Sequence, residues 1–212
     1  MTISRRLTVI GLALLAGPAF AQTSPVSTPA DPPLPRVAIE TSVGRFVVEI
    51  EVKKAPITAA NFLRYVDQKR LDGITFYRTC RVEARFGFVQ FGVNGDPKKS
   101  LPAIRHEPTS LTGLKHLDGT LSIARRGLGT AQGEFTISVG DQPGMDADPS
   151  RPPDADRTDL GYATFGRVVE GMDVVLKVFG APISPTATVR GAFKGEVPVA
   201  PVRILTVRRV KG

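Results

Sequence analysis

The chain has 212 residues, of which 42% are hydrophobic, and it carries a formal net charge of +8. This supplies enough apolar sequence for one globular domain, and scattered basic residues with only 7% aromatics argue against a nucleic-acid-binding surface. The single cysteine, Cys80, excludes an intrachain disulfide, and we interpret it as a small buried apolar side chain.

The N-terminus has the pattern of a secretory signal. Arg5 and Arg6 precede an apolar run from Leu7 to Leu15, and Ala19-Phe20-Ala21 supplies the small residues that a signal peptidase needs. The run is shorter than the roughly 20 residues that span a bilayer, which argues against a membrane anchor. We therefore predict a signal at residues 1–21, a periplasmic or secreted protein of net charge +6, and no stable membrane insertion after cleavage.

A proline-rich segment at residues 22–35 is predicted to be a linker, because proline cannot join a helix interior or a central strand. The folded domain is expected at residues 36–212. Two strands open it, at 36–41 and 44–52, where apolar side chains alternate and Ser42-Val43-Gly44 forms the turn.

A helix is predicted to begin at Pro56, which suits a first helical turn, and to end at Gly73. Its apolar residues recur at helical spacing on one face: Ala59, Phe62, Leu63 and Val66. Strands are then expected near residues 74–78, 88–93, 121–124, 135–139, 163–168 and 202–210, with a second helix at 172–178. Many short strands with two helices indicate an antiparallel β architecture.

Several short motifs follow one another in a fixed order. They are Phe76-Tyr77-Arg78, Gly87-Phe88-Val89-Gln90, Gly119 to Arg125, Gly133-Glu134-Phe135-Thr136-Ile137, Met145-Asp146, and Tyr162 to Met172. Taken together they resemble the cyclophilin family of peptidyl-prolyl isomerases, over roughly residues 36–180 and again in the last strand. Several motifs at compatible spacings are much more specific than any one of them.

The resemblance implies a mainly β fold, with a closed eight-stranded antiparallel barrel capped by two helices. It implies an enzyme that speeds rotation about the X–Pro amide, for which neither a nucleophile nor a cofactor is needed. Arg78 is implied to be the catalytic residue. The implied substrate-binding residues are Phe88, Gln90, Ala124, Arg125, Glu134, Thr136, Met145 and Tyr162.

Each implied residue has a role around the proline. Arg78 donates to the carbonyl of the proline and toward its nitrogen, while Gln90 orients Arg78 and the substrate backbone. Phe88 and Met145 form walls for the proline ring. Backbone groups near residues 124 and 125 hold the residue before proline. Phe86 is an alternative to Phe88, because the segment between Arg78 and Gln90 is expected to be a longer loop than in short cyclophilins.

Some residues depart from the family pattern. The motif at 133–137 usually reads Ser-Gln-Phe-Phe-Ile, so Glu134 replaces a neutral amide and Thr136 replaces an aromatic wall. Glu134 is also expected to offer Arg78 an ion-pair partner. Gly144 stands where some members carry tryptophan, and Tyr162 stands where many carry histidine.

Two functions follow from this pattern. The first is a monomeric peptidyl-prolyl isomerase that acts on proline-containing polypeptides and assists the folding of exported proteins. The alternative is a non-catalytic proline-peptide-binding or chaperone module on the same fold, which Glu134 and Thr136 favour. No metal site is predicted, because His106 and His116 lack metal-ligand spacing and the acidic segment near residues 146–159 is interpreted as a solvated insertion.

Overall fold

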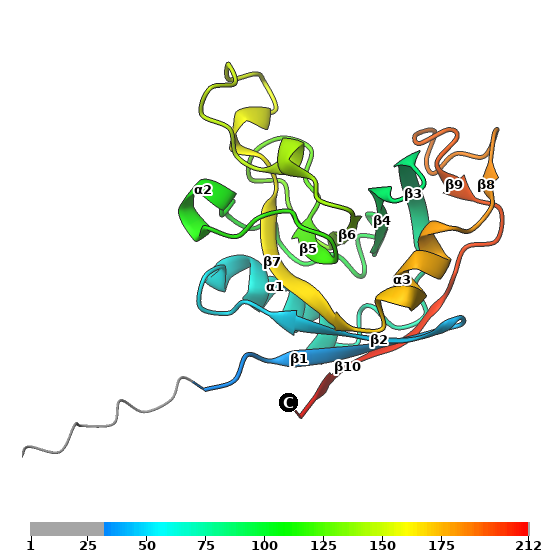
Figure 1. Cartoon of the computed structure of the whole chain (residues 1–212). Coiled ribbons are helices and arrows are strands. Elements are labelled where there is room, and N and C mark those ends of the chain that lie inside the picture. Colours follow the sequence, from blue (N-terminus) through cyan, green and yellow to red (C-terminus); the bar gives the residue numbers. More distant parts are fainter. Residues whose placement is uncertain (1–31, 212) are drawn as a thin grey trace, which may run out of the picture. The chain divides into compact units, whose positions relative to one another are not determined.

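The computed structural model describes residues 32–211 (Figure 1). The predicted signal and residues 22–31 of the predicted linker lie outside the described residues. Within residues 32–211, no helix combines the length and the apolar character that crossing a membrane requires.

Eight strands form one antiparallel sheet in the order β10-β1-β2-β7-β5-β6-β4-β3. Their bounds are β1 Arg36–Thr41, β2 Gly44–Ile50, β3 Phe76–Glu83, β4 Phe86–Gly92, β5 Thr120–Ile123, β6 Glu134–Val139, β7 Ala163–Glu170 and β10 Ile204–Val210. Two further strands, β8 (Ile183–Ser184) and β9 (Val197–Pro198), pair with each other. The helices are α1 (Pro56–Asp67), α2 (Thr109–Thr112) and α3 (Met172–Phe179), with single 3₁₀ turns at Pro143–Met145 and Thr158–Leu160. The prediction of a mainly β fold is confirmed.

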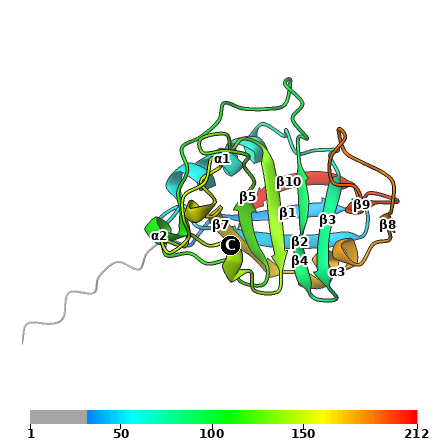
Figure 2. The ribbon, with the colours of Figure 1, turned by 90° about the horizontal axis from the view of Figure 1, so that it is seen from above.

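The sheet curls on itself without closing. Figure 2 shows β3, β4 and β5 lying crosswise over β1, β2 and β10. The two edge strands, β3 and β10, are joined near their ends by one isolated bridge, Thr75 to Arg203. Pro198 and Pro201 interrupt the segment that faces β3, and proline has no N–H to donate to a ladder. The expected closed barrel is therefore wrong, and the structure is a half-barrel.

The inside of the half-barrel is filled with aromatic rings. Phe135 lies at their centre, with ring centroids 5.1 Å from Phe62, 5.7 Å from Phe91 and 5.8 Å from Phe165. All four side chains are fully buried. Three of them come from strands and Phe62 comes from α1, so the predicted apolar face of the helix packs on the sheet as expected.

Helix α1 is shorter than predicted and receives its N-terminal cap from far along the chain. The buried Glu107 carboxylate accepts hydrogen bonds from the Thr58 backbone N–H and hydroxyl, both at 2.7 Å. A carboxylate is favourable there because the first N–H groups of a helix lack partners. At the other end the helix stops at Asp67, because Lys69 has a φ of 54° and turns lead to Gly73.

Strands β3 and β4 form a tight hairpin, so the expected irregular loop after Arg78 is wrong. Arg78 lies inside β3 and is directly opposite Gln90 in β4. The two strands are separated by residues 84 and 85 alone. Cys80, opposite Phe88, is half-buried rather than buried, because this edge strand leaves part of its surface exposed.

Asp72 fastens the segment before β3 to β10. Its carboxylate accepts two hydrogen bonds from the Arg208 guanidinium, at 2.8 and 2.7 Å, and one from the Val207 N–H at 3.1 Å. The Arg208 contact is the main cause of a lowered pKa at Asp72, against an ordinary value of 3.8. The ionised form therefore stabilises the fold above about pH 3.8, and this contribution is lost as the pH falls through the lowered pKa.

We expect Asp72→Asn to lower the free energy of unfolding by about 1 kcal/mol at neutral pH, because Arg208 is partly exposed and solvent screens the pair. At an acidic pH below the lowered pKa of Asp72 the two proteins should differ much less, since the wild-type carboxyl is then protonated. Urea unfolding at both pH values measures this. An equal loss at both would show that the charge of Asp72 contributes nothing.

Candidate active site

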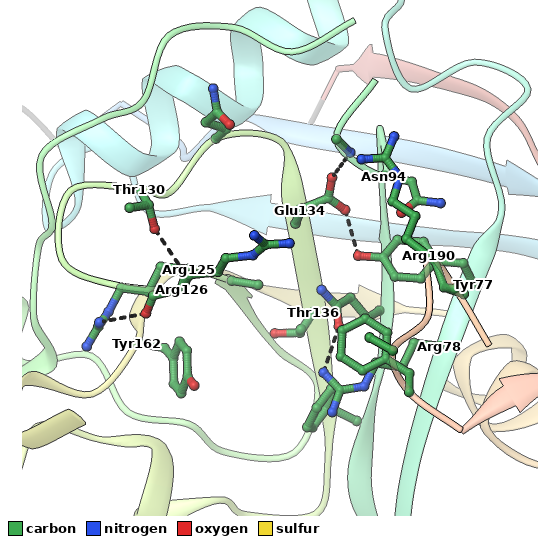
Figure 3. Close-up of a pocket in the computed structure, with 18 of the residues that line it drawn as sticks. Tyr77, Arg78, Asn94, Arg125, Arg126, Thr130, Glu134, Thr136, Tyr162 and Arg190 are labelled. Atoms are coloured by element: carbon green, nitrogen blue, oxygen red, sulfur yellow. Dashed lines mark hydrogen bonds between the residues drawn. The ribbon is translucent and has the colours of Figure 1, made fainter. Parts of the chain in front are cut away.

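A cleft of about 1010 Å³ opens between β3, β4, β6 and the loops around them (Figure 3). It is lined by the residue predicted to be catalytic and by every residue predicted to bind substrate: Arg78, Phe88, Gln90, Ala124, Arg125, Glu134, Thr136, Met145 and Tyr162. The structure thus brings together residues that are up to 84 positions apart in the sequence. Their roles remain predictions.

The sequence analysis missed one side of this cleft. Val189, Arg190, Ala192 and Phe193, from the loop between β8 and β9, also line it. Gly191 in this loop signals a turn, but no pattern in the sequence connects that turn with Arg78.

The Arg78 guanidinium is fixed by four side chains. Its Nη1 donates to Gln90 Oε1 at 3.1 Å, and its Nε donates to the Glu196 carboxylate. Its Cζ lies 4.0 Å from the ring centroid of Phe193 and 5.0 Å from that of Phe88. The contact with Gln90 is the geometry that the predicted orienting role requires.

The alternative between Phe86 and Phe88 is resolved in geometric terms. Side chains alternate along a strand, and Phe88 shares the cleft face of β4 with Gln90. Phe86 has the same parity, but it stands at the start of β4, is 37% exposed and does not line the cleft.

Glu134 does not pair with Arg78, so that expectation is wrong. In the β4–β6 register, Glu134 is opposite Gly92, whereas Gln90 is opposite Thr136. The Glu134 carboxylate therefore lies farther along the sheet, where it accepts from the Tyr77 hydroxyl at 2.6 Å and from the Gly95 N–H at 3.0 Å. Figure 3 shows it pointing toward Tyr77 and away from Arg78.

Burial is the largest influence on the Glu134 carboxyl and raises its pKa. The hydrogen bonds from Tyr77 and Gly95 and the positive charge of Arg190 act in the opposite direction. Burial likewise raises the pKa of the Tyr77 hydroxyl well above its usual range, and the neighbouring Glu134 charge adds to that shift. The Tyr77 hydroxyl therefore stays protonated and donates a hydrogen bond to Glu134.

Thr136 forms part of the floor of the cleft. Its hydroxyl is within 2.7 Å of the Ser122 hydroxyl, and both side chains are buried. The hydroxyl that threonine introduces in place of an aromatic wall is therefore paired with Ser122.

Arg125 binds the acidic insertion with its side chain. Its Nη2 donates to the Gly161 carbonyl at 3.0 Å and to the Arg157 carbonyl at 2.5 Å. The Ala124 N–H donates to the Glu134 carbonyl at 2.8 Å, so it is not available to a peptide. Within residues 32–211, the Ala124 carbonyl and the Arg125 N–H have no hydrogen-bonding partner.

Met145 is followed in the chain by Asp146, which forms a buried pair with His116 that the sequence analysis did not identify. The adjoining Asp146 carboxylate accepts from His116, at 2.7 Å from Nδ1 and 3.1 Å from the backbone N. Burial lowers the pKa of the His116 imidazole. The Tyr162 N–H donates to the Met145 carbonyl at 3.0 Å, which joins the two residues on this side of the cleft.

The family model described as cyclophilin type peptidyl-prolyl cis-trans isomerase matches residues 36–209. The chain belongs to the cyclophilin family. A peptidyl-prolyl cis-trans isomerase of Acinetobacter baylyi is 33% identical over 173 residues, which cover 81% of this chain and 84% of that protein. Peptidyl-prolyl cis-trans isomerase A of Dickeya dadantii is 31% identical over 208 residues, or 97% and 95% of the two chains.

Solved structures show the same fold. The crystal structure of a Cryptosporidium parvum cyclophilin type peptidyl-prolyl cis-trans isomerase, obtained in the presence of the dipeptide Ala-Pro, superimposes with a TM-score of 0.65. The match covers 84% of this chain and 99% of that one at 18% identity. The family and the mainly β fold predicted from the sequence are confirmed, and this cyclophilin shares its family with enzymes named as isomerases.

The Tyr77–Glu134 contact of this cyclophilin gives a testable titration. Tyr77→Phe removes a hydrogen bond that lowers the pKa of Glu134, so we expect Glu134 to titrate at higher pH in the variant. The carboxyl ¹³C resonance of Glu134, followed by NMR against pH, measures the change. Tyr162→Phe is the matched control, because its ring lines the same cleft without bonding to Glu134. A midpoint that stays in place in Tyr77→Phe contradicts the assigned bond.

Proposed function

We propose that this cyclophilin catalyses cis–trans isomerisation of X–Pro bonds in proline-containing polypeptides, and that it does so as a monomer. The observation that carries the proposal is the state of Arg78. Its guanidinium is oriented by Gln90 and Glu196 in the cleft, and within residues 32–211 its Nη2 has no acceptor. The relatives that match most of the chain are named peptidyl-prolyl isomerases.

The chemistry requires stabilisation of a twisted amide. Resonance gives the C–N bond double-bond character and a rotation barrier of about 18–20 kcal/mol. In the twisted amide the nitrogen becomes pyramidal and can accept a hydrogen bond. Arg78 donates to the proline carbonyl and toward that nitrogen, while Phe88 and Met145 hold the ring.

Arg78 does not supply the whole effect. An acceleration of about 10⁵ needs roughly 7 kcal/mol, whereas a hydrogen bond to a charged group contributes about 1.5–3 kcal/mol. The remainder must come from groups that bind the twisted peptide better than the planar one. The free Ala124 carbonyl and Arg125 N–H support a role in holding the backbone before proline.

A second candidate is a peptide-binding module with negligible turnover. Thr136 and Glu134 favour it, because threonine removes an aromatic wall and a half-buried carboxylate replaces a neutral amide in the cleft. Such a module would bind proline peptides through the same cleft without twisting the amide.

We expect the wild-type protein to accelerate cis-to-trans conversion of an X-Pro peptide, and Arg78→Ala to lower kcat/KM by about tenfold to a hundredfold. A protease-coupled or NMR exchange assay measures the rate. Arg81→Ala is the matched control, since Arg81 lies on the same strand and bonds to carbonyls near the end of α3, outside the cleft.

Circular dichroism must show that the Arg78→Ala protein is folded. Unchanged turnover in that folded variant contradicts the role of Arg78. If the wild-type protein binds the peptide without accelerating its isomerisation, the protein is a peptide-binding module instead of an enzyme.

We further propose that the protein is exported and assists the folding of exported proteins. The support is the basic and apolar pattern at residues 1–21. In the native host we expect cleavage after Ala21, so that Gln22 is the first residue of the mature chain. Intact-mass measurement of cell-envelope fractions checks this, with Ala21→Arg as the variant that should accumulate as precursor. A mature species that retains Met1 contradicts export.

A further inference from the structure

The loop between β8 and β9 turns back toward the cleft as a small hairpin, orange in Figure 1 and beside β3. Val189 and Ala192 exchange both backbone hydrogen bonds at 2.9 Å. Between them, Arg190 and Gly191 have φ of 51° and 78°, as both central residues of a type I′ turn require. Phe193 follows at a φ of 64°, which residues other than glycine rarely adopt. The surrounding structure must hold it there.

Backbone contacts bring the end of this loop to Arg78. The Thr79 N–H donates to the Glu196 carbonyl at 2.7 Å, and the Glu196 N–H donates to the Phe193 carbonyl at 3.0 Å. Glu196 is thereby tied to the residue that follows Arg78 in β3. This places the Glu196 carboxylate at Arg78 Nε and the Phe193 ring against the guanidinium.

Some N–H donors of Arg78 bond to side chains of the protein, and the others are left without an acceptor among the described residues of the cleft. A guanidinium has five N–H groups in a rigid planar fork. One on Nε goes to Glu196 and one on Nη1 goes to Gln90. These two hydrogen bonds lie on different sides of the guanidinium, and the Phe193 ring packs against its face. Together they fix the orientation of the guanidinium, and with it the directions of the remaining N–H donors. None of them has an acceptor among the residues that the structure describes.

We propose that Glu196 and Phe193 are positioning residues that hold Arg78 in the orientation needed for isomerisation. The inference rests on the proposed function of Arg78. The negative charge of Glu196 weakens the electrostatic attraction of the Arg78 guanidinium for a substrate carbonyl. Glu196 therefore increases the rate of isomerisation only if its effect on the orientation of Arg78 outweighs this loss of attraction. The side chains of Arg78 and Glu196 are 21% and 30% exposed, so solvent screens this ion pair only in part.

The test compares Glu196→Ala with Glu196→Gln. Alanine removes the acceptor, and we expect kcat to fall by about tenfold while KM changes by less than about twofold. Glutamine keeps an oxygen that can accept from Nε, so it should restore most of the lost kcat. The matched control is Asp67→Ala, which removes the carboxylate partner of another arginine, Arg209; neither residue lines the cleft. It should leave kcat unchanged.

A spectroscopic measurement separates positioning from general stability. The Arg78 Nε–H resonance should be shifted and protected from exchange in the wild type, lost in Glu196→Ala and unchanged in Asp67→Ala. Phe193→Leu keeps apolar bulk but removes the aromatic face, and we expect it to lower kcat by about threefold. This variant also keeps the proposal testable if Glu196→Ala does not fold.

The outcomes for the two proposals are distinct. If Arg78→Ala is inactive while Glu196→Ala turns over as fast as the wild type, or faster, the positioning role is wrong and the proposed function stands. If Arg78→Ala is as active as the wild type, the proposed role of Arg78 is wrong and the inference falls with it. A loss of kcat in Glu196→Ala, partly restored by glutamine, supports both.

Discussion

The cleft depends on one constraint, the register that places Gln90 opposite Arg78 on one side and Thr136 on the other. Side chains alternate between the two faces of a strand, so a slip of β4 by one residue would turn Gln90 to the face opposite Arg78 and Thr136. The buried rings of Phe91 and Phe135 prevent such a slip, because they occupy the intervening positions and their centroids lie 5.7 Å apart in the core. The same packing that stabilises the half-barrel therefore sets the geometry of the site.

Several charged side chains in the cleft are hydrogen-bonded to near neighbours. Glu134 is bound by Tyr77 and by the backbone at Gly95, and Arg125 is committed to carbonyls of the acidic insertion. The Arg78 guanidinium pairs with Glu196 and Gln90, but these contacts use only part of its fork. The cleft thus presents an oriented cation beside the buried hydroxyls of Ser122 and Thr136 and the ring of Phe88.

The sequence predicted what depends on local pattern and on the order of motifs. Alternating apolar residues located most strands, and the spacing of Ala59 to Val66 located the buried face of α1. Motif order identified the residues that line the cleft. The expected loop after Arg78 was wrong because a two-residue turn without glycine, Ala84-Arg85, gives little local signal for a hairpin.

Contacts between side chains that are far apart in the sequence left no local pattern from which to predict them. Glu196 is 118 positions from Arg78, and Glu107 is 49 positions from the helix end that it caps. Glu134 was a reasonable partner for Arg78 by motif position alone. The β4–β6 register decides against it, because Glu134 is opposite Gly92 rather than Gln90, and its carboxylate bonds to Tyr77 and Gly95 instead.

The failure of the barrel to close and the fixing of Arg78 have one cause. If β10 paired with β3 along its length, the outer edge of β3 would be filled and the Thr79 N–H would be used in that ladder. Instead, Pro198 and Pro201 stop the ladder, and the outer edge near Arg78 is met by the Glu196 carbonyl. The edge left open by the sheet is the edge through which the loop before β9 reaches Arg78, so the departure from a closed barrel gives the arginine its carboxylate partner.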